Sequence, residues 1–488
     1  MTAGGVFRPV RLDAPEGGSL ARGGVQSTIG LLAQGLLRFV AALLVGHIAG
    51  RGEFGVVASA IAAATILSLL WPTTAGAAAS KFFARARGAG DLGGLSAIAA
   101  HLRTRTLLAS LVLGLAAIPV WVFYDGGSWL GGLCVAALAI AYSGYIFTRG
   151  VQFGAGQVRR ATVWDLTSVA VGLLGITVLL LVGVRGPALV LALAAAYGLY
   201  ALAGWPYRVT GRPEREQRRE IDAFVLFGAA GALASTGFLQ FSQIAAGLVG
   251  GVEQAGVYAS ALSLATPASM LAASLSLVLL PSLAEAWGRG DKAAFHAQSD
   301  TATRALATVM VAIFGALLIG SRLVVDLVWG GKYPEARDLL PILVLAVLAT
   351  NLAVGSVNSL TTRSRRGVRL TMIASVAGMA VGVLVWLVAA PRWGNTGIAI
   401  GYLCGTTVVA AIPVVVAWRT GGHRWGALFA KVGVAVAAMV GIAVLQRAAD
   451  LPVVLDLAFA AVFLVCWLLA NRATVTALLR GRGQTARP

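Results

Sequence analysis

Arg38 lies in the middle of an apolar stretch, "LLAQGLLRFVAALLVGHIAG" over 31–50, where a permanent charge is costly. A guanidinium stays ionised and can donate two parallel hydrogen bonds to phosphate oxygens. Facing lipid at mid-membrane, it would cost about 3 kcal/mol. Arg38 must therefore face protein or water, and the sequence leaves two partners open. One is an anionic cargo, such as a diphosphate in a central cavity; the other is a structural acceptor, such as backbone carbonyls or Asp165.

Other polar side chains in apolar stretches are candidates for the same cavity. Gln34 lies one helical turn before Arg38 and could contact a sugar hydroxyl or make an interhelical hydrogen bond. His47 lies nearer the end of that stretch, where a simple polar contact and a titrating role are both open. Arg149 ends another stretch and is either an interfacial charge or a residue that gathers headgroups. The remaining candidates are Gln240, Gln243, Tyr258, Asn351 and Asn358.

Acidic side chains are scarce in these stretches. Of the 19 Asp and Glu residues, Asp165 is the one plausible intramembrane acid. An exporter of cationic drugs is expected to need a buried carboxylate. The three cysteines lie in apolar runs, which argues against a disulfide framework or a metal site. No catalytic residue, metal or cofactor is predicted, since paired carboxylates and a phosphate-binding glycine loop are both missing.

Composition identifies the elements that must position these residues as membrane helices. The chain has 488 residues, of which 58% are hydrophobic and 12% charged. The charged fraction is about half that of an average soluble domain. The net charge of +19 is better explained by basic cytoplasmic loops than by nucleic-acid binding. We therefore expect an all-α integral membrane protein that crosses the bilayer many times.

About twenty apolar residues cross the hydrocarbon core, and the sequence predicts fourteen such helices. With both termini cytoplasmic, 28 of the 38 Lys and Arg residues fall on the cytoplasmic side and seven on the other. This asymmetry supports the topology. The expected helices are 27–50, 54–76, 106–124, 129–152, 164–184, 187–207, 222–250, 254–282, 305–329, 338–360, 370–390, 396–418, 426–446 and 451–470.

The sequence contains an internal repeat with a shift of 201 residues. "GHIAGRGEFGVVASAIAAAT" (46–65) and "GLVGGVEQAGVYASALSLAT" (247–266) are identical at nine of twenty positions. With one residue removed, "ARARGAGD" (84–91) matches "AEAWGRGD" (284–291) at five of eight positions. Six helices separate the copies, so both should have the same orientation, related by an axis along the membrane normal. The expected segments are a disordered cytoplasmic tail 1–26, an N-lobe 27–210, a basic linker 211–221, a C-lobe 222–420, two unrepeated helices in 421–472 and a cytoplasmic tail 473–488.

These motifs resemble those of a known transporter superfamily. "GHIAGRGEFGVVASA" (46–60), the segment 251–291 and "LVWGGKYPEARDLLPILVLA" (327–346) are similar to the flippases for lipid-linked oligosaccharides in the MOP superfamily. The resemblance implies two lobes in a V that rock between inward-open and outward-open states. It implies translocation of undecaprenyl-diphosphate-linked saccharide across the bacterial cytoplasmic membrane, without covalent chemistry. Many such relatives carry an acid midway along helix 7, where this chain has Gln240 and Gln243, so ion coupling there is in doubt.

Several alternatives stay open. The same fold could export small molecules as a MATE-like drug antiporter, or flip a lipid II-type peptidoglycan precursor. A membrane-embedded polysaccharide polymerase or ligase is less favoured, because the expected outer loops are short and hold no catalytic cluster. Expected partners are the bilayer, the polyprenyl-diphosphate-linked saccharide, and a polysaccharide polymerase with glycosyltransferases; nucleic acid is not expected.

Overall fold

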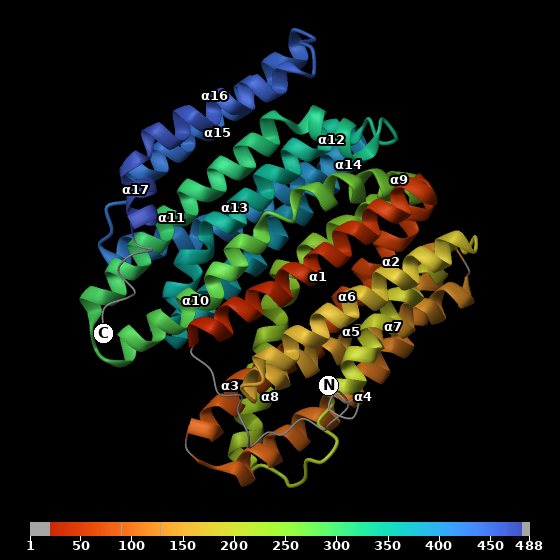
Figure 1. The fold of residues 1–488 in the computed structure, drawn as a ribbon, viewed down its shortest axis with the longest axis vertical. Helices are drawn as coiled ribbons and strands as arrows, with labels where there is room; N and C mark the ends of the chain where they lie inside the picture. Colours follow the sequence, from red (N-terminus) through yellow and green to blue (C-terminus); the bar gives the residue numbers. More distant parts are fainter. Residues whose placement is uncertain (1–19, 89, 127, 481–488) are drawn as a thin grey trace. The chain divides into compact units, whose positions relative to one another are not determined.

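The computed structural model describes residues 20–88, 90–126 and 128–480, and these residues form helices and short connections without a β-strand (Figure 1). The all-α fold expected from composition is confirmed. The chain divides into two compact units, Met1–Ala259 and Ser260–Pro488. The lobe and linker boundaries expected from the repeat remain a prediction.

The first unit is organised around α5 (Trp129–Gly154), which packs against five other α-helices of the unit. Small residues allow the close approach: β-carbons on Gly150 and Gly154 would overlap the backbone of α3. The helix α1 packs on α6, and α6 packs on α7. The elements are α1 (Leu20–Ile48), α2 (Arg51–Leu69), α3 (Pro72–Gly88), α4 (Leu92–Asp125), α5, α6 (Val158–Leu181), the 3₁₀ helix Gly186–Leu189, α7 (Val190–Gly204), α8 (Arg215–Ala232), the π-helical turn Leu233–Gly237 and α9 (Phe238–Ala265), whose last residues enter the second unit.

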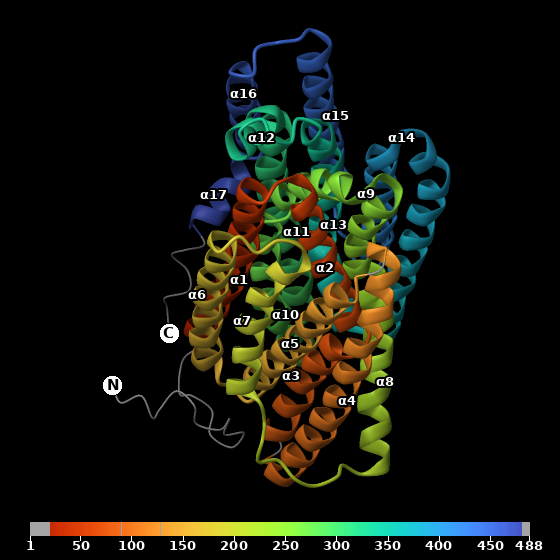
Figure 2. The same ribbon diagram turned by 90° about the vertical axis from the view of Figure 1, so that its right-hand side faces the viewer.

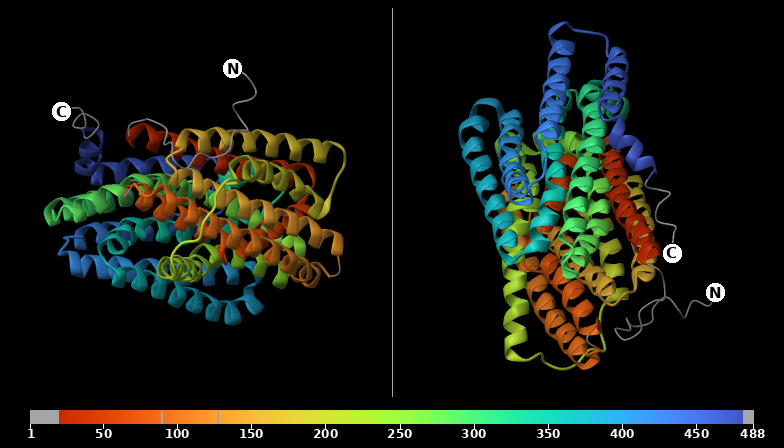
Figure 3. Two further views of the ribbon diagram at one scale, coloured as in Figure 1. Left: turned by 90° about the horizontal axis from the view of Figure 1, so that it is seen from below. Right: turned by 90° about the vertical axis from the view of Figure 1, so that its left-hand side faces the viewer.

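In the second unit α13 (Ala336–Arg363) has the central place, packing against α10, α11 and α14. The two unrepeated helices, α15 and α16, both pack along α11 (Figure 3, right). The elements are α10 (Ser269–Gly288), α11 (Lys292–Ile319), α12 (Ser321–Trp329), α13, α14 (Arg365–Gly421), α15 (Gly426–Ala448), α16 (Leu455–Ala470) and α17 (Arg472–Arg480).

Positive-φ glycines divide the longest helices into separate membrane passes. The helix α14 has 57 residues, about 85 Å at 1.5 Å per residue, which is far more than one pass needs. Gly394, at φ 52°, turns it back on itself, and Trp386 Nε1 donates to the Ile398 carbonyl across the two arms (Figure 2). Gly251 divides the stretch Arg215–Ala265 in the same way. Eleven described stretches are long and apolar enough to cross a membrane; with these two divided and the shorter helix Leu455–Ala470 added, they account for the fourteen passes.

The internal repeat is visible in local backbone geometry. Gly50 has φ 97° and ψ 178°, and its counterpart Gly251 has φ 79° and ψ −179°. Asp91 and Asp291 each begin a helix, and each side chain accepts a hydrogen bond from the backbone N–H three residues later. Matching turns at matching positions support descent of the two halves from one unit.

Several expected boundaries are wrong, because hydropathy reports the apolar thickness of the membrane and not the length of a helix. The expected loop 77–105 is mostly helical, since α3 continues to Gly88 and α4 begins at Leu92. The expected loop 283–304 is occupied in the same way by α10 and α11. The helix expected over 305–329 is broken at Gly320. The first helix begins at Leu20, inside the expected tail; the remainder of that tail, 1–19, and residues 481–488 lie outside the described part of the chain.

Candidate functional site

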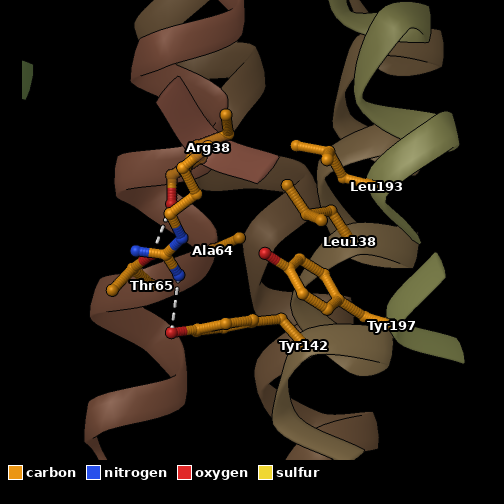
Figure 4. Close-up of a pocket in the computed structure, with 8 residues that line it drawn as sticks. Arg38, Ala64, Thr65, Leu138, Tyr142, Leu193 and Tyr197 are labelled. Atoms are coloured by element: carbon orange, nitrogen blue, oxygen red, sulfur yellow. Dashed lines mark hydrogen bonds between the residues drawn. The ribbon is translucent and has the colours of Figure 1, made fainter. Parts of the chain in front are cut away.

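Arg38 is held in a pocket of the first unit by a tyrosine. Its Nη2 donates a 2.7 Å hydrogen bond to the hydroxyl of Tyr142 on α5, and the side chain is partly buried (Figure 4). The pocket is open on one side, and about 240 Å³ of empty space, part of it open solvent, lies in and around it. Residues of α1, α2, α5 and α7 line it: Arg38, Ile61, Ala64, Thr65, Leu138, Tyr142, Leu193 and Tyr197.

Asp165 is not the partner of Arg38, so that structural alternative does not hold. Within residues 20–88, 90–126 and 128–480, no carboxylate forms an ion pair with this guanidinium. Its acceptor is a neutral phenol, which stabilises the charge by a hydrogen bond without cancelling it. The pocket therefore presents an uncompensated positive charge.

Asp165 belongs to a separate buried cluster near the start of α6. Its Oδ2 lies 3.1 Å from Nε of Arg149, and its Oδ1 accepts a hydrogen bond from the hydroxyl of Tyr145 at 3.1 Å. Gln34 donates to the Asp165 carbonyl at 3.1 Å and to the Ser168 hydroxyl at 2.7 Å. The structure thus brings Gln34 and Arg149 together, and for Gln34 it shows the interhelical hydrogen bond.

Four tyrosines join the Arg38 pocket to the Asp165 cluster. The ring centres of Tyr142 and Tyr197 are 5.2 Å apart, those of Tyr145 and Tyr197 are 4.9 Å apart, and those of Tyr145 and Tyr200 are 4.8 Å apart. This group was not among the residues predicted from the sequence. The signal was the spacing: "AYSGY" over 141–145 and "AYGLY" over 196–200 each place two tyrosines three residues apart, on one helix face.

The other candidates of the first unit lie outside the pocket. Nδ1 of His47 lies 2.9 Å from the Leu43 carbonyl one turn earlier. Gln243 is 2% exposed and donates to the Ala255 carbonyl, which ties the two parts of α9 together across Gly251. Gln240 is partly buried on α9, and Tyr258 is fully buried after the kink.

Asn351 and Asn358 are buried on α13 in the second unit. The Asn351 amide donates to the Val347 carbonyl of its own helix at 2.7 Å. The Asn358 amide donates to the hydroxyl of Ser276 on α10 at 2.6 Å. Both amides therefore have structural hydrogen bonds, and that of Asn358 joins α13 to α10.

The described residues contain no group of three or more His, Cys, Asp or Glu side chains that could hold a metal ion. Cys134, Cys404 and Cys466 are free thiols. The polar side chains that line the Arg38 pocket are Arg38 itself, Thr65, Tyr142 and Tyr197.

Solved structures similar to this one are membrane transporters. A MATE protein in complex with MaD5 has a TM-score of 0.62 at 15% identity, over 82% of this chain and 95% of its own. An inward-facing multidrug resistance MATE transporter of the MOP superfamily has a TM-score of 0.62 at 16% identity, over 83% and 96%. A eukaryotic MATE transporter has a TM-score of 0.61 at 16% identity, over 82% and 97%. At these identities the similarity shows the fold.

Sequence comparison gives the family. No curated protein matches the chain. The profile of the family described as "Lipid II flippase MurJ" matches residues 168–472, which is more than half of the chain. Together with the MOP-type fold, this supports a multi-pass flippase or transporter. The protein belongs to the MurJ lipid II flippase family.

Proposed function

We propose that the protein carries a polyprenyl-diphosphate-linked peptidoglycan precursor of the lipid II type across the bacterial cytoplasmic membrane. The cargo headgroup passes beside Arg38, and both termini lie on the cytoplasmic side. The observation that carries this proposal is the positive charge of Arg38, which is bonded to a phenol instead of a carboxylate. Arg38 precedes the segment that matches the family, which begins at residue 168.

A diphosphate suits the charge of this pocket. A guanidinium can donate two parallel hydrogen bonds to phosphate oxygens, and it keeps its charge at any physiological pH.

The charge of the pocket argues against export of cationic drugs. A cation entering beside Arg38 would be repelled, and the buried Asp165 is already paired with Arg149. A diphosphate-linked oligosaccharide, the cargo first suggested by the sequence, presents the same anionic group as lipid II. The family description favours lipid II over the oligosaccharide.

Reconstitution into vesicles tests the proposal. Lipid II and an undecaprenyl-diphosphate-linked oligosaccharide are supplied separately, and their movement between leaflets is followed for the wild type, Arg38→Ala and Arg38→Lys. We expect lipid II to move, Arg38→Ala to slow it at least tenfold, and Arg38→Lys to retain part of the rate. Arg85→Ala, which removes an equal charge from a side chain that is 70% exposed, is the matched control.

Undiminished lipid II movement in both Arg38 variants would exclude Arg38 from transport. Movement of the oligosaccharide alone would show that the cargo assignment is wrong.

A further inference from the structure

We infer that Tyr142 is a positioning residue: it fixes the guanidinium of Arg38 for the cargo diphosphate while leaving its charge uncompensated. This inference rests on the proposed function. The evidence is the hydrogen bond of 2.7 Å between Arg38 Nη2 and the Tyr142 hydroxyl, inside a pocket that both residues line.

Two membrane arginines of the same unit are held in different ways. Arg149 is bonded through Nε to the carboxylate of Asp165 at 3.1 Å, so its charge is matched by an opposite charge. Arg38 is bonded instead to the hydroxyl of Tyr142, which is a phenol and not a carboxylate. A carboxylate at the position of Tyr142 would compete with an anionic cargo. A phenol supplies an acceptor without that competition.

Tyr142 can fix Arg38 because its own ring is held. The ring centre lies 5.2 Å from that of Tyr197 and 6.0 Å from that of Tyr145. Tyr145 is anchored in turn by its hydrogen bond to Asp165. A long, flexible arginine side chain thereby ends on an acceptor that is part of a packed aromatic group.

The guanidinium of Arg38 lies between two side chains that line the pocket, Tyr142 and Thr65. Figure 4 shows one terminal nitrogen on the Tyr142 hydroxyl and the other on the side of Thr65. Thr65 donates its own hydroxyl proton to the Ile61 carbonyl. A diphosphate entering here would meet a guanidinium whose orientation is already set, which reduces the cost of ordering it on binding.

Substitutions at Tyr142 separate positioning from charge. Tyr142→Phe keeps the ring and removes the acceptor. Tyr142→Gln restores a neutral acceptor, and Tyr142→Glu has nearly the same shape as Gln but adds a negative charge. Tyr200→Phe is the matched control, because it removes a buried 2.9 Å tyrosine hydrogen bond to Gln152, between α7 and α5, without touching Arg38.

The experiment is isothermal titration calorimetry of the full-length protein in detergent, with farnesyl diphosphate as the probe and farnesol as the uncharged comparison. We expect Tyr142→Phe to weaken diphosphate binding about tenfold, which is about 1.4 kcal/mol. Tyr142→Gln should recover part of the affinity, Tyr142→Glu should bind more weakly than Tyr142→Gln, and farnesol binding should not change. Tyr200→Phe should bind like the wild type.

Any other result of the titrations shows which part of the proposal is wrong. If Arg38→Ala abolishes diphosphate binding but Tyr142→Phe leaves it unchanged, the positioning role is overturned and the proposed function stands. If Tyr142→Glu binds as tightly as Tyr142→Gln, the need for a neutral acceptor is overturned. Equal weakening in Tyr142→Phe and Tyr200→Phe would mean a general packing effect and would overturn positioning. Unchanged binding in Arg38→Ala would overturn the proposed function itself.

Discussion

Gly55 on α2 and Gly256 on α9 pack backbone against backbone, and the two are counterparts in the internal repeat. A β-carbon on Gly55 would overlap the carbonyl group of Val252, and one on Gly256 would overlap the carbonyl of Arg51. Arg51 and Val252 are themselves counterparts, each four residues before its glycine. The two helices therefore cross in a locally symmetric contact, which small residues permit in a membrane.

Adding one methyl group at this crossing should separate the helices. We expect Gly55→Ala or Gly256→Ala to lower the free energy of unfolding by about 1–3 kcal/mol, the range for overpacking a close contact. Gly433→Ala is the control, because a β-carbon there meets nothing within 4 Å. Thermal unfolding in detergent measures the difference, and equal melting temperatures for all three variants would show that the crossing is not tight.

A buried ion pair joins the unrepeated helices α15 and α16 to α12 within the second unit. Arg322 on α12 contacts both carboxylate oxygens of Asp456: its Nη2 lies 2.6 Å from Oδ1 and its Nε lies 3.2 Å from Oδ2. The side chain of Asp456 is fully buried. Gln446 on α15 adds a 2.8 Å hydrogen bond to the same carboxylate. Removing one partner should leave a buried charge without compensation, so we expect Arg322→Ala to cost about 3–5 kcal/mol of stability.

Urea or thermal unfolding checks this value. Arg85→Ala should change stability little, since the Arg85–Glu220 pair is 70% and 43% exposed and such pairs contribute about 0–1 kcal/mol. The double variant Arg322→Met/Asp456→Leu should recover most of the loss, because both charges are then gone. A double variant no more stable than Arg322→Ala would refute the electrostatic explanation.

The sequence was sufficient to predict the all-α membrane fold and the matching turns of the internal repeat. The length of the apolar stretches and the basic loops between them indicate membrane-spanning helices directly. Gly50 and Gly251 mark equivalent turns, because glycine adopts positive φ readily. Helix lengths were not predictable in this way. Beyond the hydrocarbon, polar residues continue a helix without a hydropathy signal, as in α4 between Asp91 and residue 106.

The candidate site was predicted only at its centre. Arg38 stands out by itself, since a charge inside an apolar helix needs an explanation. The partner of Arg38 could not be predicted from the sequence, because Asp165 and Tyr142 lie on different helices and only the packing of those helices decides which of them faces Arg38. The hydrophobic fraction of the sequence counts tyrosine as an apolar residue, so the four tyrosines did not stand out within their apolar helices.

Acidification should destabilise the connection between α14 and α15. The ring of His423 stacks on that of Trp425, with 4.3 Å between the ring centres. Burial lowers the pKa of His423. The positive charges of Arg304 and Arg363 and the neighbouring His296 lower this pKa further, while the carboxylate of Asp300 raises it. The unfolded chain therefore binds more protons than the folded protein as pH falls below about 6.5, so stability should rise with pH through that window. Melting temperatures from pH 5 to 8 should show a steeper rise for the wild type than for His423→Gln. Parallel curves would contradict this assignment.

Transport should respond to the membrane potential more than to a sodium gradient. The diphosphate of the proposed cargo is negative, and an inside-negative potential favours outward movement of each such charge by about 2.3 kcal/mol per 100 mV. Asp165, which would otherwise be a candidate for binding a coupling cation, is engaged by Arg149 at 3.1 Å and by Tyr145. Vesicles with a potassium diffusion potential and no sodium gradient should therefore move lipid II faster than vesicles with a sodium gradient at zero potential. The reverse order would indicate that a sodium site drives the cycle, and loss of that sodium response in Asp165→Asn would locate the site at this carboxylate.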